Sequence, residues 1–363
     1  MRILIVEPFM VESHRAWAED YARYSGHEVR VLGLQGSHWK WRMHGGAVTM
    51  AKRYRELNWK PDLVLATDMM DLALFTSLLR RELTGVKVAL YFHENHITYP
   101  WSAGDEDKQK GTDRHYGFIN YSSALVADKV FFNSQFHKNT FLKSLPEFLK
   151  IYPDHRNQFS IAEIEKKSDV LPLGLDLSFI DALREEVQNR PVSKRAVILW
   201  NHRWEYDKGP EEFFRALFEL QDRGVEFRLK VLGRSFGRKP PIFKEAQSRL
   251  SDKIDCFGFE EDRSEYALAL LQSDILPVTS VQDFFGISVV EAAYADVFPL
   301  VPKRLAYPEH FPDAYHSTFF YKNGRDLVNR LQRLIFDVSV IRKQKTRQFV
   351  EHYDWQSAQL KPL

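Results

Sequence analysis

Residues 275–295 read ILPVTSVQDFFGISVVEAAYA and contain the pattern that decides the fold. An apolar run typical of a buried strand is followed by a polar turn, and Gly286 then opens a second apolar segment. Glycine permits a tight turn from a strand into a helix at this point. The free N–H groups and the positive dipole end of such a helix suit a phosphate. The stretch therefore predicts a strand, a glycine turn and a helix whose start can bind an anion.

Two carboxylates, Asp283 and Glu291, lie on either side of this turn. Glu291 is surrounded by Val, Ala and Tyr residues in the predicted helix. Because burial of an unpaired carboxylate is costly, we expect Glu291 to meet a partner or a ligand. A Glu that points to solvent, or one that pairs with a neighbouring Arg, fits the same pattern.

Outside this stretch, apolar runs alternate with amphipathic segments along the chain. Such alternation is typical of α/β proteins, in which crossover helices join buried parallel strands. There are two series of about 150 residues, and they predict two Rossmann-like domains. The predicted strands cover residues 3–6, 29–32, 63–66, 86–92 and 129–132, and then 196–200, 227–232, 254–257, 275–278 and 298–301. The predicted helices cover residues 14–24, 69–83, 116–127 and 136–149, and then 211–223, 242–250, 264–272 and 286–295.

A connection between the two predicted domains is indicated by the charged stretch at residues 163–169 and by Pro172 and Gly174 after it. We therefore expect a first domain and a second domain, followed by a helical C-terminal segment that either stays with the second domain or returns to the first. Their expected ranges are 1–168, 169–340 and 341–363.

The composition is that of a globular protein long enough for two cores, with 363 residues of which 44% are hydrophobic. The formal net charge is only +2, so contact with a nucleic acid would depend on a local basic patch. The single Cys256 excludes an internal disulfide framework and provides no metal-binding spacing. No apolar run approaches membrane-spanning length, so we expect a cytoplasmic protein with no membrane partner.

Polar side chains repeatedly follow the ends of the predicted strands. Parallel strands bind ligands outside their carboxyl ends, so this pattern in both series predicts a cleft between two facing domains. Loops are polar in most proteins, but the recurrence of His, Arg and carboxylates in both halves favours a site. The residues in question are Glu7, His93, Glu94, Asn133, Asn201, His202, Arg203, Arg234 and Asp283.

Arg203 and Lys208 lie just before the predicted helix at residues 211–223. Two cations beside a helix N-terminus make an anion site, and Arg suits bidentate contact with a phosphate. Taken alone, each cation is better explained by a solvated ion pair with Glu205 or Asp207, because charged loops are common. Together with the glycine turn described above, the two cations favour a diphosphate site.

His93 follows a buried predicted strand, where an imidazole can bond to a sugar hydroxyl or a phosphate, or act as an acid or base. Histidines that only satisfy structural contacts are common, so the strand-end position is what favours a substrate role. A zinc site made of His93, Glu94 and His96 matches none of the familiar metal spacings.

The stretch HWKWRMHGG at residues 38–46 interleaves aromatic and basic side chains. Such a surface can stack nucleobases and bind phosphates. Packing of Trp39 and Trp41 in a core at the start of a helix fits the pattern equally well. A role in RNA binding predicts that Trp39, Lys40 and Arg42 are exposed.

These motifs together resemble the retaining family-4 glycosyltransferases, which have the two-domain GT-B fold. The general pattern is Arg203 and Lys208 followed by Asp283 and Glu291. The resemblance covers both halves of the chain and is closer to one branch, the tRNA-queuosine mannosyltransferases. The branch-specific segments are residues 91–95, 99–100, 133–134, 152–156, 202–205, 284–286 and 307–309, together with Trp39-x-Trp-Arg.

The resemblance implies the roles of the donor-binding residues. Arg203 and Lys208 would hold the diphosphate of the donor, and Glu291 would hold its ribose hydroxyls. The backbone amides at Gly286 and Ile287 would contact the transferring sugar.

The resemblance also implies the residues around the reacting carbon and the acceptor. Asp283 would hold the sugar, and His93 would lie over it near the reacting carbon. The family usually has Glu where this chain has Asp283. On the acceptor side the resemblance implies contacts from His14, Trp39, Arg42, Glu94 and Asn133.

The implied reaction transfers mannose from GDP-mannose to a hydroxyl of queuosine in tRNA, with retained anomeric configuration and no metal or other cofactor. Relatives commonly carry glycines after the first strand, where residues 9–13 of this chain are FMVES. A nucleotide-sugar transferase with a glycan or small-molecule acceptor is an alternative, and so is a silent nucleotide- or RNA-binding relative. The intact Arg203, Lys208 and Glu291 argue against the silent relative.

Overall fold

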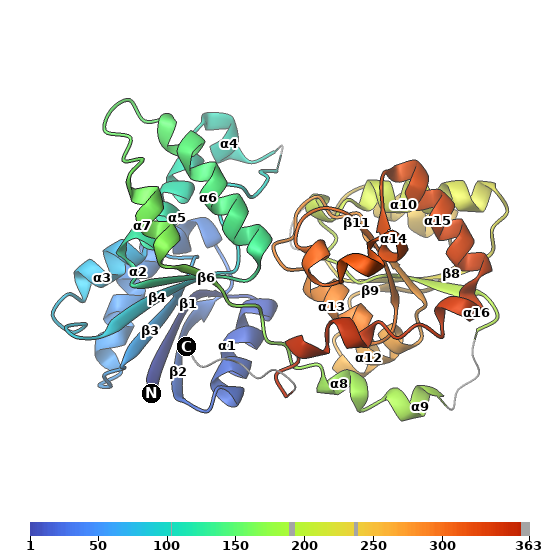
Figure 1. Ribbon diagram of the computed structural model, residues 1–363, viewed down its shortest axis with the longest axis horizontal. Helices are drawn as coiled ribbons and strands as arrows, with labels where there is room; N and C mark the ends of the chain where they lie inside the picture. Colours follow the sequence, from blue (N-terminus) through green and yellow to red (C-terminus); the bar gives the residue numbers. More distant parts are fainter. Residues whose placement is uncertain (103, 189–192, 236–238, 357–363) are drawn as a thin grey trace. The chain divides into compact units, whose positions relative to one another are not determined.

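The computed structural model describes residues 1–102, 104–188, 193–235 and 239–356. The chain divides into two compact units, of which the first covers Met1–Leu175 and the second begins at Asp176. Each unit is a parallel sheet flanked by helices (Figure 1), which confirms the predicted α/β class. No helix within the described ranges is long and apolar enough to cross a membrane.

The first unit is built on a six-stranded parallel sheet with the strand order β2-β1-β3-β4-β5-β6. Its central strands are almost fully buried, as expected for apolar runs covered by helices on both faces. The strands are β1 (Arg2–Met10), β2 (Glu28–Gln35), β3 (Leu63–Thr67), β4 (Lys87–Phe92), β5 (Lys129–Phe132) and β6 (Ser168–Val170). The helices are α1 (Glu12–Tyr24), α2 (Trp39–Glu56), α3 (Leu72–Leu78), α4 (Glu106–Lys110), α5 (Arg114–Val126), α6 (Gln135–Lys150) and α7 (Ser160–Lys166).

The second unit has a six-stranded parallel sheet with the strand order β12-β11-β10-β7-β8-β9. This is the 3-2-1-4-5-6 order of the Rossmann fold. The strands are β7 (Ala196–Trp200), β8 (Phe227–Leu232), β9 (Ile254–Gly258), β10 (Ile275–Pro277), β11 (Phe298–Pro302) and β12 (Phe320–Tyr321). The helices are α8 (Ser178–Asp181), α9 (Arg184–Gln188), α10 (Pro210–Asp222), α11 (Ile242–Arg249), α12 (Arg263–Leu271), α13 (Ile287–Tyr294), α14 (His316–Phe319), α15 (Gly324–Phe336) and α16 (Val338–Ile341).

Every predicted strand is present, but the predicted connection at residues 163–169 is wrong. Those residues end α7 and form most of β6, the edge strand of the first sheet. The edge position explains the miss, because a strand of sequence Ser-Asp-Val with one free edge needs no apolar run. The polypeptide passes between the units after this strand, in the stretch that contains Pro172 and Gly174.

The C-terminal segment after α16 forms short 3-10 turns that pack on the second unit. The hydroxyl of Thr346 donates to the carbonyl of Ala293 at 2.8 Å, and Asp354 accepts a hydrogen bond from the backbone N–H of Leu177 at 3.0 Å. The expectation of a return to the first domain falls in part on residues 357–363, outside the described residues.

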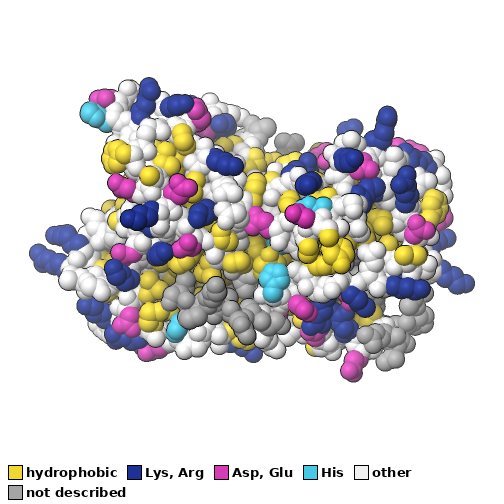
Figure 2. All heavy atoms as spheres, in the orientation of Figure 1, with side chains coloured by type: hydrophobic (Ala, Val, Ile, Leu, Met, Phe, Trp, Pro, Cys, Tyr) yellow, Lys and Arg dark blue, Asp and Glu magenta, His cyan; other side chains and the backbone are white. Residues whose placement is uncertain are grey.

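Basic and acidic side chains are interspersed on the face shown in Figure 2, and hydrophobic side chains lie between them. This mixture agrees with the net charge of +2 and identifies no uniformly basic face in that view.

Candidate functional site

Each sheet has one point at which the strand order reverses, between β1 and β3 in the first unit and between β7 and β10 in the second. Ligands of open α/β sheets bind outside the carboxyl ends of the strands at such points. The predicted site residues Asn201, His202 and Arg203 follow β7, and Asp283 follows β10. In the first unit, Glu7 lies in the last part of β1. The fold therefore gives each unit a candidate site of its own.

Lys208 and Asp283, which are 75 residues apart in the sequence, form a buried ion pair in the second unit. The Nζ atom of Lys208 lies 3.1 Å from Oδ2 of Asp283 and donates at 3.1 Å to the carbonyl of Gln282. The carboxylate of Asp283 also accepts from the hydroxyl of Tyr307 at 3.0 Å. Burial alone would raise the pKa of Asp283, but the charge of Lys208 outweighs it and lowers the pKa. Asp283 is thus an anion whose Oδ2 atom contacts both Lys208 and Tyr307.

Arg203 lies beside this pair. Its Nη2 atom is 3.3 Å from Oδ2 of buried Asp207, which is also 3.6 Å from the Nζ atom of Lys208. The ion-pair alternative for Arg203 is therefore present in the structure. Its side chain nevertheless remains 48% exposed, so a guanidinium surface is available to an anion.

Two glycines shape the turns around these cations. Gly209 has φ +64°, and a Cβ atom there would lie 2.4 Å from the carbonyl oxygen of Thr279. Gly286 has φ +95° and precedes α13, with a would-be Cβ atom 3.0 Å from the ring of Tyr307. Both positions require the left-handed region that glycine enters without strain. The predicted glycine turn before the helix is confirmed, and α13 begins at Ile287 with no side-chain cap.

Glu291 is held inside the second unit by a tyrosine. The hydroxyl of Tyr266 donates to Oε2 of Glu291 at 2.7 Å, and Asn201 donates to the same hydroxyl at 3.2 Å. Asn201 also donates to the carbonyl of Ser288 at 2.9 Å, which ties β7 to the first turn of α13. Burial raises the pKa of Glu291, and the hydrogen bond from Tyr266 opposes that rise. The carboxylate is thus positioned by one neutral donor, Tyr266, as expected if Glu291 meets a partner.

His202 lies between the cations and the start of α13. Its Nδ1 atom is 2.7 Å from the hydroxyl oxygen of Ser288. Burial, followed by the charge of Lys208, lowers the pKa of His202 to about 3, so its imidazole is neutral.

In the first unit, His93 is fixed through its backbone at the end of β4. Its N–H donates to Oδ1 of Asp68 at 2.7 Å, and its carbonyl accepts from Nδ2 of Asn133 at 2.9 Å. The other end of the Asn133 amide is 2.8 Å from Nδ1 of His137. The side chain of His93 keeps a buried Nε2 atom with no hydrogen-bond partner in the described part of the chain. Asn133 therefore positions the backbone of His93, and the Nε2 atom of its ring lies 3.9 Å from Oε2 of Glu7.

The imidazoles of His14 and His93 stack with their centroids 4.2 Å apart, and Glu7 lies beside both. The Nδ1 atom of His14 is 3.1 Å from Oε2 of Glu7. Burial lowers the pKa of His14, but the charge and hydrogen bond of Glu7 outweigh it and raise that pKa to about 9. Burial, and then the charge of His14, hold the pKa of His93 well below its ordinary value. At neutral pH the pair consists of a charged His14 and a neutral His93.

Glu7, His14 and His93 also form the one group within the described ranges whose possible metal-ligand atoms lie within 4.8 Å of one another. A metal requires lone pairs that converge on a single point. The two imidazole planes are only 23° from parallel, so their in-plane lone pairs run side by side. The geometry therefore favours the ion pair between Glu7 and His14 over a metal site.

The stretch at residues 38–46 begins helix α2, and only Met43 and Gly46 in it are buried in the first unit. Trp39 is half-buried and stacks on His96 at 4.8 Å. Lys40 pairs with Asp105 at 2.8 Å and Asp107 at 2.6 Å. The core-packing alternative therefore describes Trp39 but is wrong for Trp41, which is 63% exposed. Trp39, Lys40 and Arg42 are half-buried and do not form the open surface that an RNA role predicts.

Arg42 and Glu94 are two further acceptor-side candidates in the first unit. Arg42 is half-buried and reaches the carbonyl of Gln35 at 3.4 Å. Glu94 is half-buried, and its Oε1 atom lies 3.7 Å from Nε2 of His96.

Both halves of the chain match known protein families. Residues 2–175 match the family described as tRNA-queuosine alpha-mannosyltransferase N-terminal, and residues 182–351 match glycosyl transferases group 1. The tRNA-queuosine alpha-mannosyltransferase of Drosophila melanogaster is 32% identical over 367 residues, which cover 99% of this chain and 94% of that protein.

The chain belongs to the tRNA-queuosine alpha-mannosyltransferase family. It is therefore a glycosyltransferase, which confirms the enzyme class expected from the sequence.

Solved structures show that the family shares the GT-B fold. Sucrose-phosphate synthase from Thermosynechococcus elongatus has a TM-score of 0.71 at 14% identity, with 98% of this chain and 96% of that chain covered. The Anabaena protein HepE, solved with UDP and glucose, has a TM-score of 0.65 at 14% identity, with 98% and 96% covered. A glycosyltransferase from Rickettsia africae has a TM-score of 0.65 at 19% identity, with 98% and 95% covered.

Three residues of this glycosyltransferase escaped the sequence analysis although they hold candidate site residues in place. Asp68 follows β3, so the same strand-end rule that selected His93 could have found it. Tyr307 occurs in a branch-specific segment, but nothing in the sequence indicates that its hydroxyl donates a hydrogen bond to Asp283. Tyr266 lies on α12, and no local signal connects it to Glu291, because the contact spans 25 residues.

Proposed function

We propose that this protein transfers mannose from GDP-mannose to queuosine in tRNA, with retained anomeric configuration and in the cytoplasm. The observation that carries the proposal is the similarity to a tRNA-queuosine alpha-mannosyltransferase, which is 32% identical over 99% of this chain. The cations and glycine turns at the strand ends of the second unit support it.

The donor is assigned to the second unit. Arg203 and Lys208 bind the diphosphate, and Glu291 accepts hydrogen bonds from the ribose hydroxyls. Negative charge develops on the diphosphate as the sugar leaves, so preorganised cations at that point stabilise the transition state. The proposal includes no metal or other cofactor, because the two cations supply the positive charge. The network of Tyr266 and Asn201 supports the ribose role by fixing the Glu291 carboxylate.

The sugar and the acceptor are assigned to groups at the strand ends. Asp283 and the amides at Gly286 and Ile287 bind mannose, and His93 contacts it through its unpartnered ring nitrogen. A neutral His93 can donate or accept a hydrogen bond, whereas an imidazolium can only donate. The remaining acceptor-side groups in the proposal are His14, Trp39, Arg42, Glu94 and Asn133.

The direct test incubates the purified protein with GDP-mannose and tRNA that contains queuosine, followed by mass spectrometry of the nucleosides. The expected result is queuosine carrying one added hexose, with no addition to the same tRNA that carries guanosine at that position. Hexose transfer to a glycan or small metabolite without transfer to queuosine would establish the alternative acceptor class. GDP-mannose hydrolysis with no transfer to queuosine would also contradict the proposal.

A further inference from the structure

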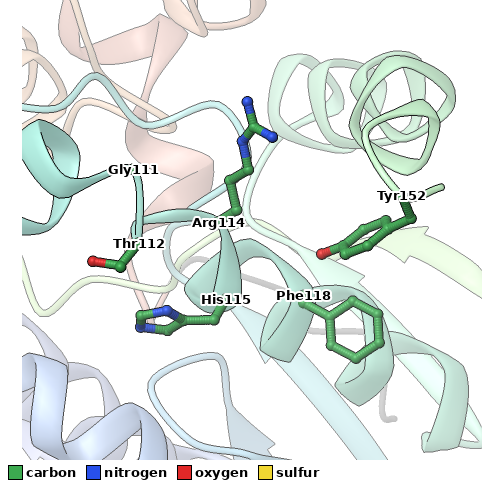
Figure 3. A pocket seen from close by; sticks show the side chains of 6 residues that line it. All are labelled: Gly111, Thr112, Arg114, His115, Phe118 and Tyr152. Atoms are coloured by element: carbon green, nitrogen blue, oxygen red, sulfur yellow. The ribbon is translucent and has the colours of Figure 1, made fainter.

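The first unit contains a cavity that lies outside the residues assigned to the reaction. It has a volume of about 420 Å³ and lies at the start of α5, opposite the chain that leaves α6 (Figure 3). Pockets that bind small organic groups span about 300–1,000 Å³. The lining residues are Gly111, Thr112, Arg114, His115, Phe118 and Tyr152.

Two aromatic rings form one wall of this cavity. Phe118 is 43% exposed although it lies on a helix whose other face is packed in the core. Its ring meets that of Tyr152 edge to face at 5.6 Å, and Tyr152 is held from behind by Phe148 at 5.9 Å. Figure 3 shows Tyr152 reaching across the cavity toward the helix that carries Phe118. The wall therefore offers a positioned aromatic surface to a planar ligand.

The polar groups of the cavity are available to a ligand. In the described ranges, the guanidinium of Arg114, the imidazole of His115 and the hydroxyl of Tyr152 make no ion pair or hydrogen bond. A cation in the first turn of α5 opposes the helix macrodipole, so helix stability does not explain Arg114. Arg156 adds a second cation at the rim, because its Nε atom donates to the carbonyl of Tyr152 at 3.2 Å.

The charge of this site suits an anion. None of the described residues that line the cavity is acidic. The adjacent Asp113 is buried and pairs with Lys108 at 3.1 Å, so its charge is compensated. An aromatic wall with two cations at its edge is the arrangement that binds single-stranded nucleic acid, in which bases stack and phosphates bind Arg. Carbohydrate sites instead need carboxylate or amide side chains for the sugar hydroxyls, and this lining has neither.

We propose that this cavity binds an unpaired nucleobase of the RNA acceptor. The base packs on Phe118 with its edge toward the hydroxyl of Tyr152, and the flanking phosphates bind Arg114 and Arg156. This inference rests on the proposed function, because it takes the acceptor to be RNA.

The test measures the affinity of the full-length protein for fluorescently labelled tRNA that lacks queuosine, alongside GDP affinity. Phe118→Ala should weaken tRNA binding about tenfold, since one base stack on an aromatic ring is lost. Phe118→Trp should stay close to wild type because it keeps an aromatic surface. Arg114→Gln should lower the dependence of log affinity on log salt by about one, as expected for one lost phosphate contact. GDP affinity should be unchanged in all three variants.

Two matched controls come from other exposed positions. Phe336→Ala removes a phenylalanine that is 68% exposed on the second unit, and Arg80→Gln removes an exposed arginine in the turn after α3. Both should bind tRNA like the wild type. Wild-type tRNA affinity in Phe118→Ala and Arg114→Gln would overturn the cavity proposal. If Phe118→Ala and Arg114→Gln weakened the binding of an added acidic peptide but not the binding of tRNA, the cavity proposal would be overturned as well. Failure of hexose transfer to queuosine is a separate result, which contradicts the proposed function even if the variants lose tRNA affinity.

Discussion

The two stacked imidazoles in the first unit carry different charges because Glu7 contacts them unequally. Glu7 is 3.1 Å from the nitrogen of His14 but 3.9 Å from that of His93. Two protonated imidazoles cannot stack at 4.2 Å without strong repulsion, so protonation of His14 keeps His93 neutral. Glu7 thereby sets the hydrogen-bonding state of a ring in the proposed site.

The first prediction concerns the titration of His14. Nuclear magnetic resonance of the labelled histidines should find its pKa at about 9 in the wild type. In Glu7→Gln the pKa should fall, because the charge and hydrogen bond of Glu7 that oppose burial are lost and only the weaker effects of Asp68 and Glu94 still raise it.

The ion pair of Glu7 and His14 also makes the free energy of unfolding depend on pH. The folded-state pKa of His14 is raised above its unfolded value, so the contribution of the pair is present below pH 6.5 and lost as pH rises through about 9. The free energy of unfolding of the wild type relative to Glu7→Gln should shrink over that window. A constant difference between pH 6 and pH 10 would show that His14 is not paired in this way.

The second prediction concerns the buried pair of Lys208 and Asp283. Lys208→Met leaves the Asp283 carboxylate buried without its cation, so the second unit should lose about 3–5 kcal/mol of stability. Denaturant unfolding of the full-length protein measures this loss. Lys208→Met combined with Asp283→Asn should recover part of it, since no unpaired charge remains. Equal stabilities for the single and double variants would mean that the two side chains are not coupled.

Among the elements, the turn between β7 and α10 brings Lys208 to the site. The hydroxyl of Thr279 donates to the carbonyls of Lys208 at 3.1 Å and Gly209 at 2.9 Å. The close approach at Gly209 is possible only because glycine has no Cβ atom. This turn binds the loop after β7 to the loop after β10, on either side of the strand-order reversal.

The third prediction tests this close approach. Gly209→Ala should cost about 3 kcal/mol or more, because it adds both backbone strain and overlap with the Thr279 carbonyl. Gly224→Ala is the matched control, since Gly224 has φ +71° in the same unit but no atom within 4 Å of its would-be Cβ. The control should cost about 1 kcal/mol, for strain alone. Similar losses in the two variants would contradict the role of the close contact.

The elements also show where sequence reasoning was sufficient. The strands at residues 129–132, 196–200 and 227–232 were predicted with their observed bounds, because each is a buried run between clear turn signals. The edge strands β6 and β12 were missed, since they are short and one side of each is unpaired. Helix α3 ends at Leu78 although the apolar pattern continues to residue 83.

For the whole molecule, the repeated α/β pattern predicted two Rossmann-like sheets but not their different strand orders. The order depends on which strands pair over long sequence separations, and apolar runs carry no such information. The residues proposed to bind the donor followed from motifs on neighbouring strand ends. The partners Tyr266 and Asp68 required three-dimensional contacts. The stretch at residues 38–46 shows the reverse case, because Trp39 and Lys40 of an apparent binding pattern make contacts within the domain, although Trp41 is exposed.

The fourth prediction separates a diphosphate-binding arginine from an ordinary surface arginine in the same unit. Arg203 and Arg195 have similarly exposed side chains, at 48% and 54%, and each contacts a carboxylate, that of Asp207 and that of Glu226 respectively. Only Arg203 lies beside Lys208 at the strand-order reversal. Arg203→Ala should therefore lose transferase activity, whereas Arg195→Ala should keep it.

The most direct measurement is kcat/KM for mannose transfer from GDP-mannose to tRNA that contains queuosine, in the wild type and in these two variants. We expect transfer by the wild type and by Arg195→Ala, and a loss of about 100-fold in Arg203→Ala, the usual effect of removing one preorganised group that stabilises developing charge. Absence of transfer by the wild type, or wild-type kcat/KM in Arg203→Ala, would contradict the account.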